Sequence, residues 1–417
     1  MRRLPNLAPV AAALVLLSAL GSCTKKHSSP PEPEGPGISA RLPITARLKS
    51  LDPIQADDVF ASEQVALVYE SLLQYHYLKR PYVLVPGLAE AMPEASADGL
   101  TYVFRLKKGV LFQDDPCFTA TSGRGRELVA EDVIYSLKRL ADPKLASPGW
   151  WVLDGKIAGL DEWREVARQT GAADYSKVVP GLLAIDRYTL KIRLTRRSAQ
   201  FLYAMAMPLT SVVPREAVEY HAAAFATHPV GSGPFRLKEF APSARITWER
   251  SPSFRKETYP AEGEAGDAQA GLLADAGKPL PFLDTLEFVV YEQSGPMWSD
   301  FLGARLDLAP LPKDHYDQAI THSKELSAEL AGRGISLVKA PRMDVAHLSF
   351  NMADAYVGKH KWLRQAISLA YDQSGAIDLF YNRRAIPAEG PIPPGLAGHD
   401  PAFKSPFRKL NVARARE

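Results

Sequence analysis

The chain contains four stretches in which apolar and polar residues alternate. Such alternation places every second side chain on one face, which is the pattern of a half-buried β-strand. The stretches that show this alternation are 100–106, 190–194, 246–248 and 286–290. We expect a β-strand at each of these positions.

Other stretches repeat their apolar residues every three or four positions, the spacing of one face of an α-helix. They are 65–72, 133–140 and 363–371. These stretches are interleaved with the predicted strands irregularly, without the fixed period of a barrel or a solenoid. The pattern predicts a mixed α/β protein, and the length of 417 residues predicts two or three compact units.

The first 22 residues have the pattern of a secretory signal peptide. Arg2 and Arg3 precede an apolar run, 10–20, that is too short for a transmembrane helix. Gly21 and Ser22 then precede Cys23, and this junction is similar to the bacterial lipobox, in which the cysteine receives a diacylglycerol.

We therefore expect a lipid on Cys23, and the alternative is an ordinary signal peptide followed by a cysteine by chance. Residues 23–37, rich in proline, serine and charge, are expected to form a tether that cannot build a core. Cys117 is the other of the two cysteines, so it is left without a disulfide partner if Cys23 carries lipid. We expect Cys117 to be a buried structural thiol.

The net charge of the chain and the distribution of its basic residues argue against nucleic acid as a partner. The chain carries 50 Lys and Arg residues against 47 Asp and Glu, and the region after residue 22 is close to neutral. Its basic residues occur in short, scattered clusters, whereas a nucleic-acid-binding protein needs a basic stripe.

The stretch HPVGSGPFRLKEF, 228–240, has three possible interpretations: a phosphate-binding loop, a nucleophile on a sharp turn, or a plain turn. A Walker-type loop and the GxSxG pattern both fail to match. Pro234 leads into a strand-like segment, so the context is turn to strand and not strand to helix. We expect a turn whose glycines adopt backbone angles that other residues resist, and no catalytic role for Ser232.

No metal site, cofactor or catalytic constellation is expected from residue spacing. His221 and His228 are seven residues apart, as are His315 and His322, but no acidic or cysteine ligand joins either pair at useful spacing. Surface or capping roles are expected for these histidines. The pattern is not that of an enzyme.

Six stretches, in order, resemble the family 5 solute-binding lipoproteins of bacterial ABC importers, the oligopeptide- and dipeptide-binding type. They are LDPIQADDVFASEQVALVYESLLQY (51–75), PGLAEAMPEASADGLTYVFRLKKGVLFQDD (86–115), VAEDVIYSLKRLADP (129–143), HPVGSGPFRLKEF (228–240), LSFNM (348–352) and WLRQAISLAYDQSGAI (362–377). Each motif is weak by itself, and their shared order carries the resemblance.

The resemblance implies an α/β, two-lobed periplasmic-binding-protein type II fold with an extra domain inserted in lobe 1. Lobe 1 is expected at 38–80 and 208–312, the inserted domain at 81–207, and lobe 2 at 313–417. In the family at least a hundred further residues complete lobe 2, so we expect an incomplete lobe that exposes part of its core.

The resemblance also implies a function. We expect a periplasmic protein of the cell envelope, attached to the membrane through Cys23, that captures a peptide between its lobes and passes it to an ABC permease and ATPase. The alternatives are a non-peptide solute, such as a metal chelate, haem or a sugar, or a role as an envelope chaperone or receptor outside transport.

Seven residues are carried over as candidate ligand contacts. They are Val59, Phe60, Ala61, Trp150, Trp151, Phe350 and Asn351. For the aromatic residues among them, packing in the core is the alternative. The chain departs from the family at Val129, where a Ser or Thr helix cap is usual, and a missing cap costs about 1 kcal/mol unless another group replaces it.

Overall fold

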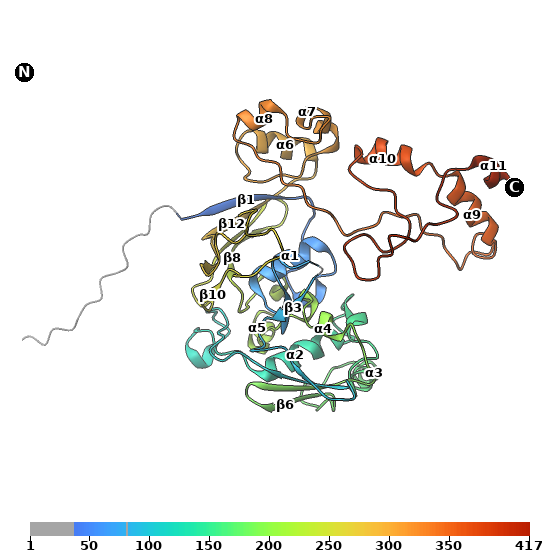
Figure 1. Cartoon of the computed structure of the whole chain (residues 1–417). Coiled ribbons are helices and arrows are strands. Elements are labelled where there is room, and N and C mark those ends of the chain that lie inside the picture. Colours follow the sequence, from blue (N-terminus) through green and yellow to red (C-terminus); the bar gives the residue numbers. More distant parts are fainter. Residues whose placement is uncertain (1–36, 81) are drawn as a thin grey trace, which may run out of the picture. The chain divides into compact units, whose positions relative to one another are not determined.

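The structure is a computed structural model that describes residues 37–80 and 82–417 (Figure 1). Residues 38–417 form one compact unit. The predicted signal peptide, Cys23 and nearly all of the predicted tether lie outside the described residues. Among the residues that are described, no helix is long and apolar enough to cross a membrane.

The first four-stranded sheet has the order β1-β12-β9-β8. Its strands are β1 (Ser39–Ile44), β8 (Phe235–Ala241), β9 (Arg245–Arg250) and β12 (Thr285–Val290). The outer strand β1 pairs in parallel with β12, and the other two pairings are antiparallel. The alternation at 246–248 and 286–290 thus correctly predicted β9 and β12.

Helix α1 (Val59–Val68) packs against this sheet. Trp248, on β9, is completely buried, and its indole Nε1–H donates a hydrogen bond to Oε1 of Gln64, on α1, at 2.7 Å. An indole buried in this way needs such a partner, because an unpaired polar group in the core is costly.

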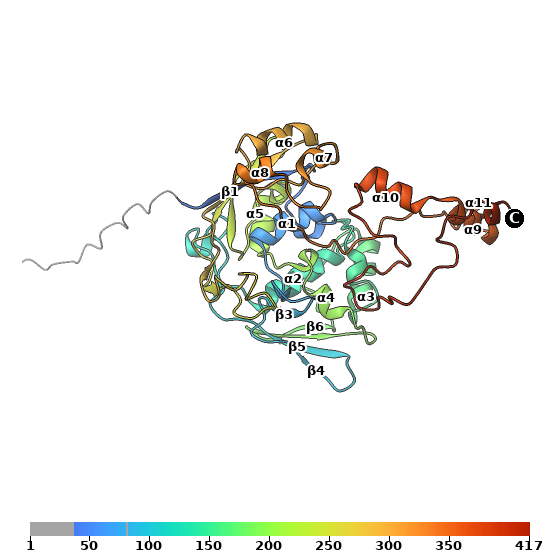
Figure 2. The same ribbon diagram turned by 45° about the horizontal axis from the view of Figure 1, so that its top comes forward.

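The second four-stranded sheet is wholly antiparallel, with the order β4-β5-β7-β6. Its strands are β4 (Glu94–Ala95), β5 (Thr101–Arg105), β6 (Leu182–Asp186) and β7 (Thr189–Arg193). Helix α2 (Ala130–Ala141) packs on one face of it, with α3 (Leu160–Thr170) beside α2 (Figure 2). The predicted strands at 100–106 and 190–194 are confirmed, as is the helix at 133–140.

The remaining elements are short. The strands are β2 (Leu73–Tyr75), β3 (Leu84–Pro86), β10 (Glu257–Thr258) and β11 (Pro279–Leu280). The helices are α4 (Phe201–Ala204), α5 (Arg215–His221), α6 (Ser294–Leu302), α7 (Tyr316–Ala319), α8 (Ala328–Gly332), α9 (Lys361–Ala370), α10 (Gln373–Tyr381) and α11 (Val412–Arg416). The 3₁₀ turns include η1 (Pro53–Gln55), η2 (Thr119–Thr121), η3 (Trp150–Val152), η4 (Pro208–Thr210) and η5 (Ala222–Thr227).

Helix α2 begins at Ala130, and Val129, at the N-cap position before it, has no side-chain oxygen to cap the helix. Asp132 supplies half of the missing cap: its Oδ2 accepts the backbone N–H of Val129 at 2.9 Å. Arg126 holds the same carboxylate with two hydrogen bonds, at 2.7 and 2.8 Å, and also pairs with Glu216. The helix start therefore lacks only the hydrogen bond that a Ser or Thr side chain would accept.

The stretch 228–240 is a turn that leads into β8, as predicted, but the reason given for its glycines was wrong. Neither Gly231 nor Gly233 has a positive φ. Instead, a Cβ on Gly231 would lie 1.9 Å from the carbonyl oxygen of Val68, and one on Gly233 would lie 2.7 Å from the carbonyl carbon of the same residue. These positions need glycine because two backbones pass in close contact.

One large core extends from Ile44 to Phe288 and includes residues of both four-stranded sheets. A separate small cluster, built on Trp298 and Ile320, packs among α6, α7 and α8. Of the described residues after 337, Leu369 is the one apolar residue classed as buried, and Trp362, Leu379, Phe380 and Ile386 are exposed. The strands of the two sheets fall in the ranges predicted for lobe 1 and its insert, and the division into lobes stays a prediction.

Candidate ligand-binding surface

Two of the stretches expected to contact a solute lie at the start of α1 and in η3. Helix α1 is capped by Asp58, whose Oδ1 accepts the backbone N–H of Ala61 at 2.8 Å. Val59 follows the cap and is 68% exposed. Trp151, in η3, is 62% exposed, although Trp is a residue that usually loses much of its surface in a folded protein.

These stretches are held together by three contacts. The side-chain amide of Gln55 donates to the carbonyl of Leu145 at 3.1 Å, and the hydroxyl of Ser147 donates to the carbonyl of Ile54. The buried ion pair of Asp52 and Arg139 joins the residues just before α1 to helix α2. The chain segments that carry Val59 and Trp151 are therefore fixed relative to each other.

The other three candidates in these stretches are less accessible to a ligand. Ala61 is 5% exposed and belongs to the core, so its side chain faces the protein interior. Phe60 and Trp150 are partly buried and pack against the same core, which is the alternative left open for the aromatic residues. The guanidinium of Arg164 lies 4.8 Å from the ring centre of Trp150 and covers part of it.

Phe350 and Asn351 lie in a segment that forms neither helix nor strand. Phe350 is partly buried, and the side chain of the exposed Asn351 accepts the backbone N–H of Ala353 at 3.1 Å. Among the described residues, no hydrogen bond or ion pair joins them to Val59 or Trp151. A role for this pair in ligand binding stays a prediction.

A pocket of about 340 Å³ lies elsewhere, and none of the seven candidates lines it. Its walls include Glu70, Ser211, Pro234, Phe254 and Glu257. This pocket was not predicted from the sequence. The signal that could have pointed to it is Glu70, a pocket-lining residue that belongs to the quoted stretch 51–75.

The pocket is bordered by a chain of charges. Arg255 donates to Glu70 at 2.7 Å and also pairs with Glu257, which accepts from Nζ of Lys107 at 2.9 Å. Burial opposes ionisation of Glu257, but the two cations outweigh it and hold its pKa below the ordinary value. The hydroxyl of Ser232 donates to Oε2 of Glu70 at 2.8 Å, and Arg255 donates to the same oxygen, so Ser232 is part of this polar network.

Asp115, His221 and His228 meet in space, contrary to the expectation that no acidic residue joins this histidine pair. The two histidines donate to the two oxygens of the Asp115 carboxylate, each at 2.8 Å. The spacing rule failed because Asp115 precedes His221 by 106 residues and is brought to it by folding. Cys117 is buried, as predicted, and burial together with the neighbouring Asp115 raises the pKa of its thiol.

The sequence profile of the bacterial extracellular solute-binding proteins, family 5 Middle, matches residues 83–417. The chain belongs to this family. Family 5 comprises solute-binding proteins and not enzymes, which agrees with the expectation from the residues.

Curated relatives of this family 5 protein include the dipeptide-binding protein of Escherichia coli, 26% identical over 76% of this chain and 51% of the relative. Heme-binding protein A of Haemophilus influenzae is 23% identical over 93% of this chain and 63% of the relative. The chain thus spans about half, and at most two thirds, of the length of these relatives.

The fold of this family 5 protein is similar to that of the murein tripeptide binding protein MppA of Escherichia coli. The two structures match with a TM-score of 0.67 at 20% sequence identity, over 91% of this chain and 64% of the other. The match shows that this mixed α/β fold is of the same type as that of MppA.

Proposed function

We propose that this family 5 protein captures a peptide and delivers it to the permease of an ABC importer. The observation that carries the proposal is the pair of exposed apolar side chains, Val59 and Trp151, on segments locked by the ion pair of Asp52 and Arg139. A large aromatic side chain on a rigid support buries much ligand surface at little entropic cost.

Peptide is favoured as the ligand because the relatives include proteins named for binding a dipeptide and a murein tripeptide. A binding protein that holds the backbone of a peptide can accept many side-chain sequences at one site. Haem is the second candidate, because the relative named for haem binding matches 93% of this chain.

Native mass spectrometry of the purified full-length gene product tests the proposal, because a captured solute is identified by its mass. We expect a set of short peptides, and haem as the bound species would replace the peptide proposal. Trp151→Ala is expected to weaken peptide binding about tenfold or more, the loss typical of an aromatic anchor. The control is Tyr220→Ala, because Tyr220, on α5, is an aromatic residue of similar exposure.

The outcome that contradicts the proposed surface is equal affinity of the Trp151→Ala variant and the unmodified protein. A chaperone or receptor role outside transport is separated by an uptake assay. A strain that lacks the gene should lose import of the identified peptide, and unchanged import would argue against transport.

We also propose that Cys23 carries a lipid that holds the protein at the cell envelope. Cys23→Ser should move the protein from the membrane fraction to the periplasmic fluid and abolish incorporation of labelled fatty acid. A variant that still takes up the label would contradict lipidation at this cysteine, and an unlabelled native protein would favour an ordinary signal peptide.

A further inference from the structure

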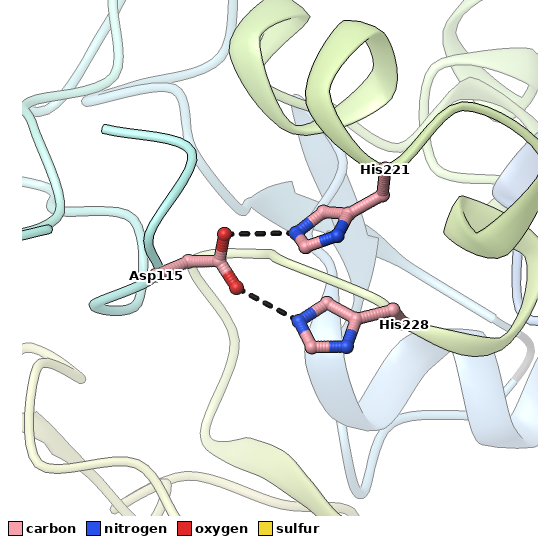
Figure 3. Close-up of side chains that lie close together, drawn as sticks. All are labelled: Asp115, His221 and His228. Carbon is pink, nitrogen blue, oxygen red and sulfur yellow. Dashed lines mark hydrogen bonds and ion pairs between the residues drawn. The ribbon is translucent and has the colours of Figure 1, made fainter. Parts of the chain in front are cut away.

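The cluster of Asp115, His221 and His228 is built from two distant parts of the chain. Asp115 lies in the loop that follows β5 and precedes η2, whereas His221 ends α5 and His228 follows η5. All three side chains point toward one another (Figure 3). Neither the family assignment nor the proposed function uses these residues.

The three side chains are close enough for one ligand atom of each to share an ion. Nε2 of His221 lies 2.8 Å from Oδ1 of Asp115, and Nε2 of His228 lies 2.8 Å from Oδ2 (Figure 3). One ligand atom of each of the three residues lies within 4.8 Å of the others. The two imidazole rings are 4.0 Å apart between centres and inclined by 33°, so both present the same edge to the carboxylate.

The carboxylate is held firmly in place. Asp115 is 6% exposed, and its Oδ1 also accepts the backbone N–H of Cys117 at 2.9 Å. The backbone N–H of Asp115 donates to the carbonyl of Gly123 at 2.9 Å, which fixes the loop that carries it. Partners of this kind orient a metal ligand before the ion arrives.

We propose that Asp115, His221 and His228 bind a zinc ion. Two imidazoles and one carboxylate form a donor set of the kind that Zn²⁺ takes in proteins, at about 2.0–2.2 Å from each atom. Ligand atoms around a tetrahedral ion lie roughly 3.3 Å apart at such distances. If Oδ1 of Asp115 binds the ion, Nε2 of His221, now 2.8 Å from it, must therefore move about 0.5 Å away. Each ring then binds through Nε2 and carries its proton on Nδ1.

The fourth position of the ion is open to water. The side chain of His228 is 52% exposed, whereas that of His221 is 11% exposed, so solvent and the ion reach the cluster from the side of His228. An ion at this position would join the loop around Asp115 to the segment that enters the turn at 230–234. That loop already contacts the turn, because the backbone N–H of Gln113 donates to the carbonyl of Gly231 at 2.8 Å.

Zinc titration of the untagged, chelator-treated full chain tests the site, with a chromophoric chelator as competitor. We expect one equivalent to bind and the melting temperature to rise with zinc concentration, because an ion that binds only the folded state stabilises it. His228→Gln removes an exposed ligand, so the variant should still fold. Its zinc affinity should fall at least 10- to 100-fold, because mutation of residues that merely hydrogen-bond to a metal ligand already causes a loss of that size.

The matched control is His322→Gln, from the other histidine pair with a spacing of seven residues, and it should leave zinc affinity unchanged. A second variant, Asp115→Asn, should lower the affinity and also the melting shift caused by zinc. The proposal is overturned if the unmodified protein binds no stoichiometric zinc, or if His228→Gln binds it as tightly as the unmodified protein. In either case the cluster is a hydrogen-bonded clamp only.

Discussion

Arg139 and Asp52 form a two-pronged ion pair in the protein interior. Nη1 of Arg139 lies 3.0 Å from Oδ1 of Asp52, and Nη2 lies 2.7 Å from Oδ2. The Arg139 side chain is 3% exposed. Burial by itself would lower the pKa of the Arg139 guanidinium, but the adjacent carboxylate outweighs it and raises the pKa. Helix α2 and the segment before α1 are thus joined by a charged pair that is largely shielded from water.

Removal of one partner of this pair should destabilise the protein strongly. Arg139→Met leaves the carboxylate of Asp52 buried without a cation, and the free energy of unfolding should fall by about 3–5 kcal/mol in urea denaturation. The double variant Arg139→Met/Asp52→Leu should recover a large part of this loss, because no buried charge remains. Arg168→Met is the control, since its pair with Glu165 is exposed to solvent and should contribute little to stability. Similar losses for Arg139→Met and Arg168→Met would contradict the prediction.

Gly231→Ala should be strongly destabilising, because the new methyl group would overlap the carbonyl oxygen of Val68. Forcing an extra carbon into a packed site typically costs about 1–3 kcal/mol, and a backbone neighbour places this site at the upper end. Gly295→Ala, in α6, is the matched control, because nothing lies within 4 Å of its Cβ position. It should be neutral or stabilise the helix by up to about 1 kcal/mol. Equal effects of the two substitutions on the urea midpoint would refute the close-approach explanation.

Val129→Thr should stabilise the protein. Threonine has the shape of valine, and its hydroxyl can accept the backbone N–H of Asp132, which completes the capping box that Asp132 already half forms. We expect the free energy of unfolding to rise by about 0.5–1 kcal/mol. Val129→Ala, which adds no oxygen, should not stabilise, so a gain in both variants would speak against capping.

Glu257 should make stability depend on pH at the acidic end. Its pKa is lower in the folded protein than in the unfolded chain, so the ionised carboxylate stabilises the fold above the unfolded value, about 4.3. This contribution is lost as the pH falls through the folded value, when the proton removes the attraction of Arg255 and Lys107. Glu257→Gln should therefore be less stable than the unmodified protein at pH 7 and lose less stability between about pH 5 and 3. Parallel curves of unfolding free energy against pH would contradict this.

The elements with strong local patterns could be predicted from the sequence. The strands that contain Phe104, Ile192, Trp248 and Phe288 show the alternation of half-buried strands, and each was found at its predicted place. The order of the motifs gave the family correctly as well. Both successes rest on features that are local in the sequence and need no knowledge of which segments meet.

The features that sequence reasoning missed depend on distant partners. Strand β1 carries no clear alternation, and it forms because β12, 246 residues away, pairs with it. Asp115 is also remote from the histidines that it contacts, by 106 and 113 residues. The close contact of Gly231 with Val68 also arises only on folding, so an explanation from glycine's own backbone freedom pointed to the wrong cause.

The parallel pairing of β1 with β12 has a consequence for the order of events during synthesis and folding. Ser39 is among the first described residues to be made, but its partner Thr285 follows only after nearly 250 more. Until then the edge of β1 has no strand to pair with, and the long separation makes this pairing slow. The first sheet is therefore completed late in folding. Until then the backbone N–H and C=O groups of β1 stay unpaired, and a protein that binds extended chains can pair with them.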